Sequence, residues 1–146
     1  TSFLLFLPQA NRKELRMVEI KDLLGISYKQ HGRDKQGFDC YGLVIFLYKR
    51  LGRVLPDFWY EKMSNPAFEE VGEKSVNSVV EMFKETDSPE YSDLIMFFDK
   101  KGRSLHIGMY LSKGMFIHCD VKGVRVSKLN GFYFKNRRFY KWLQQE

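Results

Sequence analysis

The sequence predicts an α+β domain with N-terminal helices packed on a mostly antiparallel sheet of about five to six strands. In the first half of the chain the apolar residues recur at helical spacing, whereas after Ser88-Pro89 they alternate with the period of two that is typical of strands. The 146 residues, with 13 Phe and 8 Tyr among them, are enough for one hydrophobic core and too few for two. We therefore expect a single domain over residues 1–146, with its core at about 11–143.

Three segments of the chain carry helical periodicity. The best marked begins at Cys40, with Asp39 as its N-cap, and ends near Leu51. The two other helices are amphipathic and are expected at 11–24 and 75–86. Residues 55–72 predict a long irregular loop, whose aromatic side chains either line a binding cleft or cover the core.

The strands are expected in the second half of the chain, separated by Gly-containing turns. Because short turns join neighbouring strands, the predicted sheet is a mostly antiparallel meander. Its strands are expected at 93–98, 105–111, 115–121, 124–126 and 138–142.

Composition limits the partners and the chemistry. The net charge of +6 favours an anionic partner such as a cell-wall polymer, a nucleic acid or a membrane surface. No nucleic-acid motif accompanies the basic residues at 135–141, so no nucleic acid is expected. The apolar run at 3–7 is far too short to span a bilayer, and no transmembrane segment is expected. Two cysteines do not make a disulfide framework.

Cys40 is the candidate nucleophile. A thiol in the first turn of a helix lies beside unpaired backbone N–H groups and the positive end of the helix dipole, which favour the thiolate. The alternative interpretation is a buried structural cysteine that behaves as a small hydrophobic residue.

Two histidines are predicted to lie side by side on a β-hairpin. Strand alternation places His106 and His118 on one face if Leu111 pairs with Met115, and Gly108 opposite His118 leaves room for another element to approach the sheet. With Cys40 these residues supply a thiol, an imidazole base and a polar group that orients the base.

A zinc site is the competing functional interpretation of the histidines. It would need a third ligand, and alternation points Cys119 to the opposite face from His118, where we expect a core residue. No Cys-x-x-Cys or His-Glu-x-x-His pattern is present, so no metal or other cofactor is expected.

Over residues 22–119 the chain resembles the NlpC family of bacterial cell-wall cysteine peptidases, a minimal papain-like group. The nucleophile motif Gly37-Phe38-Asp39-Cys40-Tyr41-Gly42-Leu43-Val44 is similar to that of the family. The other matching motifs are Leu24-Gly25-Ile26-Ser27-Tyr28, Leu51-Gly52 with Leu55-Pro56, Asp93-Leu94-Ile95-Met96-Phe97, His106-Ile107-Gly108-Met109-Tyr110 and Phe116-Ile117-His118.

The resemblance implies the roles of individual residues. Cys40 would be the nucleophile, His106 the base and His118 the residue that orients it. Tyr28 would line the site near the developing oxyanion, and Asp39 and Tyr41 would be further site-lining residues. The chain departs from the usual pattern at Tyr41, where Ser is commonest, and at His31-Gly32, where the family has paired glycines.

The resemblance also implies a substrate and a setting. The substrate would be a peptidoglycan stem peptide, cut between D-glutamate and a diamino acid. The enzyme would act outside the cytoplasm or in a phage tail, since an aromatic residue at Tyr41 resembles the phage-tail branch of the family. The alternatives are a phage-tail structural or wall-binding module without catalysis, and a related amidase or acyltransferase.

Overall fold

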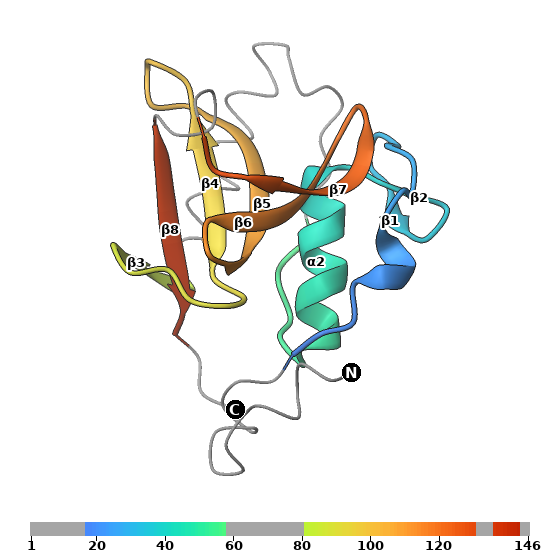
Figure 1. Cartoon of the computed structure of the whole chain (residues 1–146), viewed down its shortest axis with the longest axis horizontal. Coiled ribbons are helices and arrows are strands. Elements are labelled where there is room, and N and C mark those ends of the chain that lie inside the picture. The colour runs from blue at the N-terminus through green and yellow to red at the C-terminus, as the bar shows by residue number, and fades with distance from the viewer. Residues whose placement is uncertain (1–16, 58–80, 131–135, 144–146) are drawn as a thin grey trace.

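The computed structural model describes residues 17–57, 81–130 and 136–143 of the chain (Figure 1). Its regular elements confirm the predicted α+β class, with a helix packed on a six-stranded sheet. In chain order they are η2 (Lys21–Leu23), β1 (Arg33–Asp34), β2 (Gly37–Phe38), α2 (Cys40–Arg50), β3 (Phe83–Thr86), β4 (Leu94–Phe98), β5 (Ser104–Ser112), β6 (Met115–Asp120), β7 (Gly123–Lys128) and β8 (Arg137–Trp142).

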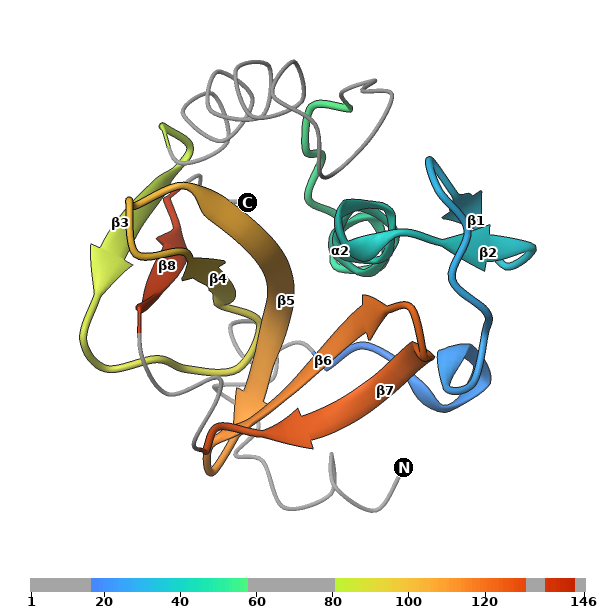
Figure 2. The same cartoon turned by 90° about the horizontal axis from the view of Figure 1, so that it is seen from above.

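The large sheet has the strand order β3-β8-β4-β5-β6-β7, and every neighbouring pair is antiparallel. The strands β4 to β7 form the predicted meander, while β8 returns from the end of the chain to pair between β3 and β4. Seen from above, α2 lies between this sheet and the small β1–β2 hairpin (Figure 2).

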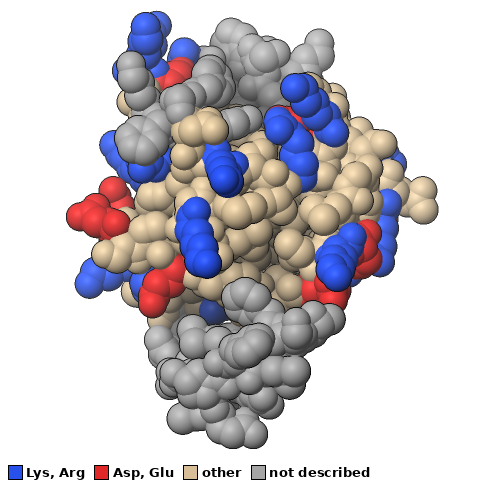
Figure 3. All heavy atoms as spheres, viewed as in Figure 1, with Lys and Arg blue, Asp and Glu red and all other residues tan. Residues whose placement is uncertain are grey.

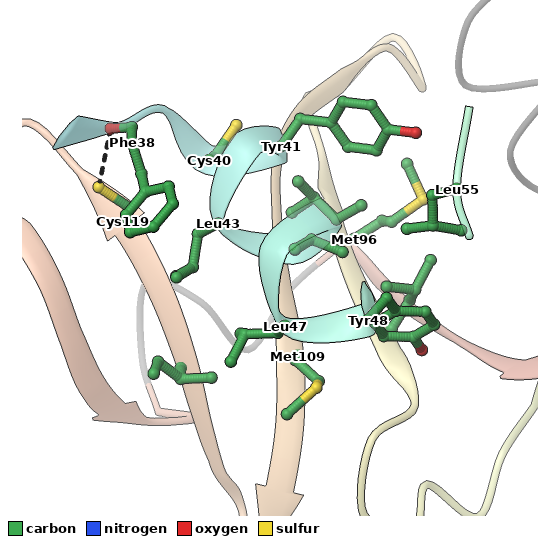
Figure 4. Close-up of a cluster of buried hydrophobic side chains, with 14 of the residues drawn as sticks. Phe38, Cys40, Tyr41, Leu43, Leu47, Tyr48, Leu55, Met96, Met109 and Cys119 are labelled. Carbon is green, nitrogen blue, oxygen red and sulfur yellow. Dashed lines mark hydrogen bonds between the residues drawn. The ribbon is translucent and has the colours of Figure 1, made fainter. Parts of the chain in front are cut away.

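The helix α2 is the predicted central helix, and it ends at Arg50, one residue before the expected end. The Asp39 side chain caps it by accepting a hydrogen bond from the Gly42 N–H at 2.6 Å, as the sequence predicts. Leu43 and Leu47 on its inner face are fully buried. They belong to one core with residues of the sheet, including Met96 and Met109 (Figure 4).

The predicted helix over 11–24 is wrong where the structure describes it. Residues 17–20 have no helical structure and only 21–23 form a 3₁₀ turn, while 11–16 lie outside the described residues. Tertiary hydrogen bonds take the backbone groups that a helix would use. The Val18 N–H donates to the Tyr91 hydroxyl at 2.7 Å, and Arg50 donates to the Glu19 carbonyl at 2.7 Å. Leu24, expected inside, is 45% exposed.

The predicted helix over 75–86 is also wrong at its end, where residues 83–86 form β3. This strand pairs antiparallel with β8, from Phe83 opposite Trp142 to Thr86 opposite Phe139. The ring of Phe83 is buried against Trp142, with centroids 5.4 Å apart. Sheet pairing across nearly sixty residues of sequence therefore overrides the local helical pattern. Residues 75–80, like the predicted loop over 58–72, lie outside the described residues.

The loop before α2 contains a hairpin, β1–β2, that the sequence analysis did not predict. It brings the backbone of Gly32 against the first turn of α2. A Cβ atom on Gly42 would lie 1.9 Å from the Gly32 carbonyl oxygen, so this approach requires glycine at position 42.

The β5–β6 hairpin has the predicted pair of Gly108 opposite His118. The predicted pairing of Leu111 with Met115 is wrong, because Ser112 pairs with Met115 and the register shifts between Tyr110 and Ser112. The two turn residues, Lys113 and Gly114, have φ angles of 52° and 75°. A two-residue turn of this kind matches the twist of the flanking strands, and the bulge at Leu111 restores the register.

The surface of the described residues is mixed in charge. Figure 3 shows Lys and Arg scattered over one face, interspersed with Asp and Glu, without a single basic patch on that face. Among the residues that the structure describes, no helix is long and apolar enough to cross a membrane.

Candidate active site

The sheet opens where α2 begins. The ladder between β5 and β6 ends at the pair Gly108–His118, so Ile107 has no partner in β6. The two strands spread apart toward α2 (Figure 2). Cys40, the first residue of α2, lies at this opening, and the backbone N–H of Ile107 hydrogen-bonds to its thiol. The sulfur of the candidate nucleophile therefore lies beside the residue that follows His106.

The Cys40 thiol is only 5% exposed, and its resting state is the protonated one. Burial, with a smaller contribution from the Asp39 carboxylate, raises the pKa of Cys40 to about 12. The backbone N–H of Tyr41, in the first turn of α2, and that of Ile107 in β5 lower the pKa, but burial outweighs them. Burial therefore opposes the thiolate that the helix N-terminus favours.

The two histidines are direct neighbours, as the strand alternation predicts. The Nε2 atom of His106 lies 2.7 Å from the Nδ1 atom of His118. Phe97 stacks on the His106 ring with centroids 5.8 Å apart, and the Phe116 ring lies 4.5 Å from that of His118. Aromatic side chains thus hold both imidazoles on the face of the sheet opposite to the α2 core.

Both imidazoles are neutral at neutral pH. Burial lowers the pKa of His106 to about 4 and that of His118 to about 3, where the neighbouring His106 lowers it further. Within the described part of the chain the His106 ring makes one hydrogen bond, through Nε2.

Burial of a neutral histidine predicts that acid destabilises the fold. Below its ordinary value of 6.5 the unfolded chain protonates His106, whereas the folded chain stays neutral until its lower pKa of about 4. The free energy of unfolding should therefore fall as the pH falls through this window, by roughly 3 kcal/mol for one histidine. Urea unfolding across the window should show a weaker pH dependence in His106→Gln. Equal pH dependence in the two proteins would contradict the buried neutral imidazole.

Three further residues extend the histidine pair, and the sequence analysis missed them. His118 Nε2 lies 2.9 Å from the Ser127 hydroxyl oxygen. Arg125 donates to the same oxygen at 3.3 Å and forms an ion pair with Asp120. Strand alternation could have identified these residues. Arg125 pairs with His118, and Ser127, two residues later, points to the same face of the sheet.

Asp39 and Tyr41 were predicted to line the site. In the structure the Asp39 side chain contacts the loop before α2, and the Tyr41 side chain contacts the segment after it. The Asp39 carboxylate is fully buried and accepts hydrogen bonds from the backbone N–H groups of Gly42 and His31 and from Arg33, the last at 2.8 Å. The hydroxyl of Tyr41 donates to the carbonyl of Pro56. Both side chains fix the approach of the chain to Cys40.

Tyr28 lies half-buried in the segment that bridges to β2 through Phe38. Burial raises the pKa of Tyr28, and the nearby Asp39 carboxylate raises it further through its charge. The phenol of Tyr28 thus stays protonated, and so remains a hydrogen-bond donor, at neutral pH.

Cys119 is fully buried, as the alternation of β6 predicts, and its thiol donates to the Phe38 carbonyl at 3.2 Å (Figure 4). Within the described residues, no three His, Cys, Asp or Glu side chains form a group that could hold a metal ion. Gly108 was expected to leave room for another element to approach the sheet, but the atoms nearest to it belong to the neighbouring strand β6. A Cβ atom there would lie 2.8 Å from the Ile117 carbonyl oxygen and 3.1 Å from the His118 Cβ, so the close approach is that of β6.

The sequence is similar to that of known proteins of one family. The family model of the NlpC/P60 family matches residues 25–142. The chain is 30% identical over 119 residues to the probable peptidoglycan endopeptidase LytE of Bacillus subtilis, covering 82% of this chain and 30% of that protein. It is 31% identical over 124 residues to the murein DD-endopeptidase MepS/murein LD-carboxypeptidase of Escherichia coli, covering 83% of this chain and 57% of that protein.

The chain thus spans less than two thirds of the length of either curated relative. The fold also matches the crystal structure of an NlpC/P60 family protein from Bacillus cereus, with a TM-score of 0.59 and 24% identity, over 82% of this chain and 36% of that one. The family match over most of the chain and the agreement in fold lead to one conclusion: the chain belongs to the NlpC/P60 family.

Proposed function

We propose that the chain is a peptidoglycan hydrolase, a cysteine endopeptidase that cleaves an amide bond in the stem peptides of the bacterial cell wall. The observation that carries the proposal is the opening between β5 and β6, where the Cys40 thiol lies against the residue next to the His106–His118 pair. Both curated relatives are described as endopeptidases of peptidoglycan or murein, which supports this substrate class.

The reaction begins with proton transfer from Cys40 to His106. As the sulfur attacks the amide carbonyl, the thiol proton passes to Nδ1 of His106, and the negative charge moves to the carbonyl oxygen. The backbone N–H of Cys40 and the phenol of Tyr28 stabilise this oxyanion. The neutral His118 ring accepts a hydrogen bond from Nε2–H of the new imidazolium, because the two nitrogens lie 2.7 Å apart.

The same imidazolium completes the cycle. It gives its proton to the departing amine, which leaves an acyl group bound to Cys40 as a thioester. A water molecule, deprotonated by the neutral His106, then attacks the thioester and releases the carboxylic acid product and the thiol. Each step moves one proton between the substrate, the thiol or water, and one imidazole nitrogen.

The proposed scissile bond joins D-glutamate to the diamino acid of the stem peptide. The net charge of +6 suits an anionic wall polymer. Action on this polymer implies that the enzyme works outside the cytoplasm or as part of a phage tail.

Defined muropeptides test the reaction and the bond. We expect incubation with a stem-peptide substrate to yield two fragments that together gain the mass of one water, with a new amine on the diamino acid and a new carboxyl on D-glutamate. Mass spectrometry of the products measures both. A product joined to an added amine would instead identify an acyltransferase, and cleavage elsewhere in the stem would contradict the proposed bond.

One observation favours a second candidate, a wall-binding or phage-tail structural module without catalysis. The Cys40 thiol is almost fully buried and protonated in the resting structure. Such a module would react slowly with iodoacetamide at Cys40 and would bind purified peptidoglycan without digesting it. Rapid labelling together with digestion would exclude it.

A further inference from the structure

We propose that Ser127 is a positioning residue that fixes the tautomer of His118, and through it the orientation of the base His106. The inference rests on the proposed function and adds Ser127 to the hydrogen-bonded pair of His106 and His118. The geometry that carries it is the continuous contact from His106 to His118 at 2.7 Å and from His118 to the Ser127 hydroxyl at 2.9 Å.

The number of protons that each imidazole ring can carry determines which tautomer of His118 is compatible with a protonated His106. When His106 takes the proton of the nucleophile, both of its nitrogens become donors, and Nε2–H points at Nδ1 of His118. A neutral His118 can accept there only if its own proton is on Nε2. That proton then needs an acceptor, and the Ser127 oxygen lies within hydrogen-bond distance.

Neither Arg125 nor Asp120, the two charged residues on the same face, provides this acceptor. Arg125 is a donor only, and it donates to the Ser127 oxygen at 3.3 Å. The Asp120 carboxylate is engaged by Arg125 in an ion pair. Among the described residues, these two charged groups from β6 and β7 and His106 from β5 bear on the pKa of His118. The hydrogen bond from Arg125 uses one acceptor site of the Ser127 oxygen, and a hydroxyl oxygen has a second that can accept the Nε2–H.

The arrangement explains why a fully buried imidazole can serve as the third member. His118 is 0% exposed, so a ring N–H without an acceptor would be costly there. The Ser127 hydroxyl satisfies the nitrogen that faces away from His106. Ser127 thereby makes the orientation of His118 compatible with a protonated His106.

Ser127→Ala tests the proposal in the intact chain. We expect kcat for peptidoglycan cleavage to fall about tenfold to a hundredfold with KM unchanged, which is the size of effect that one unsatisfied buried donor produces. Ser127→Thr keeps the hydroxyl and should restore most of the rate. Ser112→Ala, at the exposed end of β5, is the matched control and should leave the rate unchanged.

A spectroscopic readout separates this inference from the proposed function. The chain has three histidines, so ¹⁵N–¹H correlation spectra of the imidazoles can be assigned with His118→Gln as the reference. We expect the proton on Nε2 of His118 in the unaltered protein and a shift toward Nδ1–H in Ser127→Ala. An unchanged His118 tautomer in folded Ser127→Ala would overturn the inference, whether or not the protein cleaves peptidoglycan. Absence of cleavage with the expected tautomer shift would overturn the proposed function alone.

Discussion

Cys40→Ala is expected to lower the rate of peptidoglycan cleavage by about a thousandfold or more. The substitution removes the sulfur that forms the thioester, and neither the histidine pair nor Tyr28 can supply another nucleophile. The fold should survive, because alanine keeps the start of α2 and its cap at Asp39. Release of soluble muropeptides from purified walls measures the rate, and circular dichroism checks the fold.

Cys119→Ala is the matched control for this prediction. Cys119 is the second free cysteine and is also buried, but it lies on the core face of β6. Replacing its thiol by a methyl group leaves a small cavity, which should lower the free energy of unfolding by about 1 kcal/mol. The rate of peptidoglycan cleavage should be nearly unchanged. Iodoacetamide should block activity only when mass spectrometry finds the label on Cys40. Full activity of Cys40→Ala would eliminate the thioester mechanism.

His106→Gln is expected to lower the rate by about a hundredfold to a thousandfold, because glutamine cannot carry the proton of the thiol. In the unaltered protein the rate should fall in acid only as the pH approaches the lowered pKa of about 4, and not near 6.5. The two imidazoles titrate as a pair, so this acid limb belongs to both. Initial rates from about pH 3 to about pH 9 measure it.

His118→Gln provides the comparison for the base. A glutamine carbonyl can still accept from Nε2–H of His106, so this variant should lose less activity than His106→Gln. The order of the two losses distinguishes the group that carries the proton from the group that orients it. Equal rates for His106→Gln and the unaltered protein would remove His106 from the mechanism.

Local signals fixed the parts of the fold that depend on nearest neighbours. Asp39 caps α2 because its side chain and the Gly42 N–H are three residues apart, a spacing that any helix N-terminus provides. Alternation sets which side chains share a face of β5 and β6, and the bulge at Leu111 restores the register that brings His106 and His118 together.

Long-range contacts decided the elements that the sequence pattern misassigned. Residues 17–24 and 83–86 carry helical spacing, yet Tyr91 and Arg50 take backbone groups of the first segment and β8 pairs with the second. These partners lie some thirty to seventy residues away along the chain, so no window of local periodicity could include them.

The sequence by itself determined the family, the α+β class, the capped helix that begins at Cys40 and the pairing of two histidines on one face. The tertiary structure alone decided how these parts meet. The β5–β6 ladder stops at Gly108, which admits the thiol beside Ile107, and β7 brings Ser127 to His118. Burial, which outweighs the helix N-terminus and keeps the thiol and the imidazoles neutral, is likewise a property of the packed molecule, because desolvation depends on every neighbour in space.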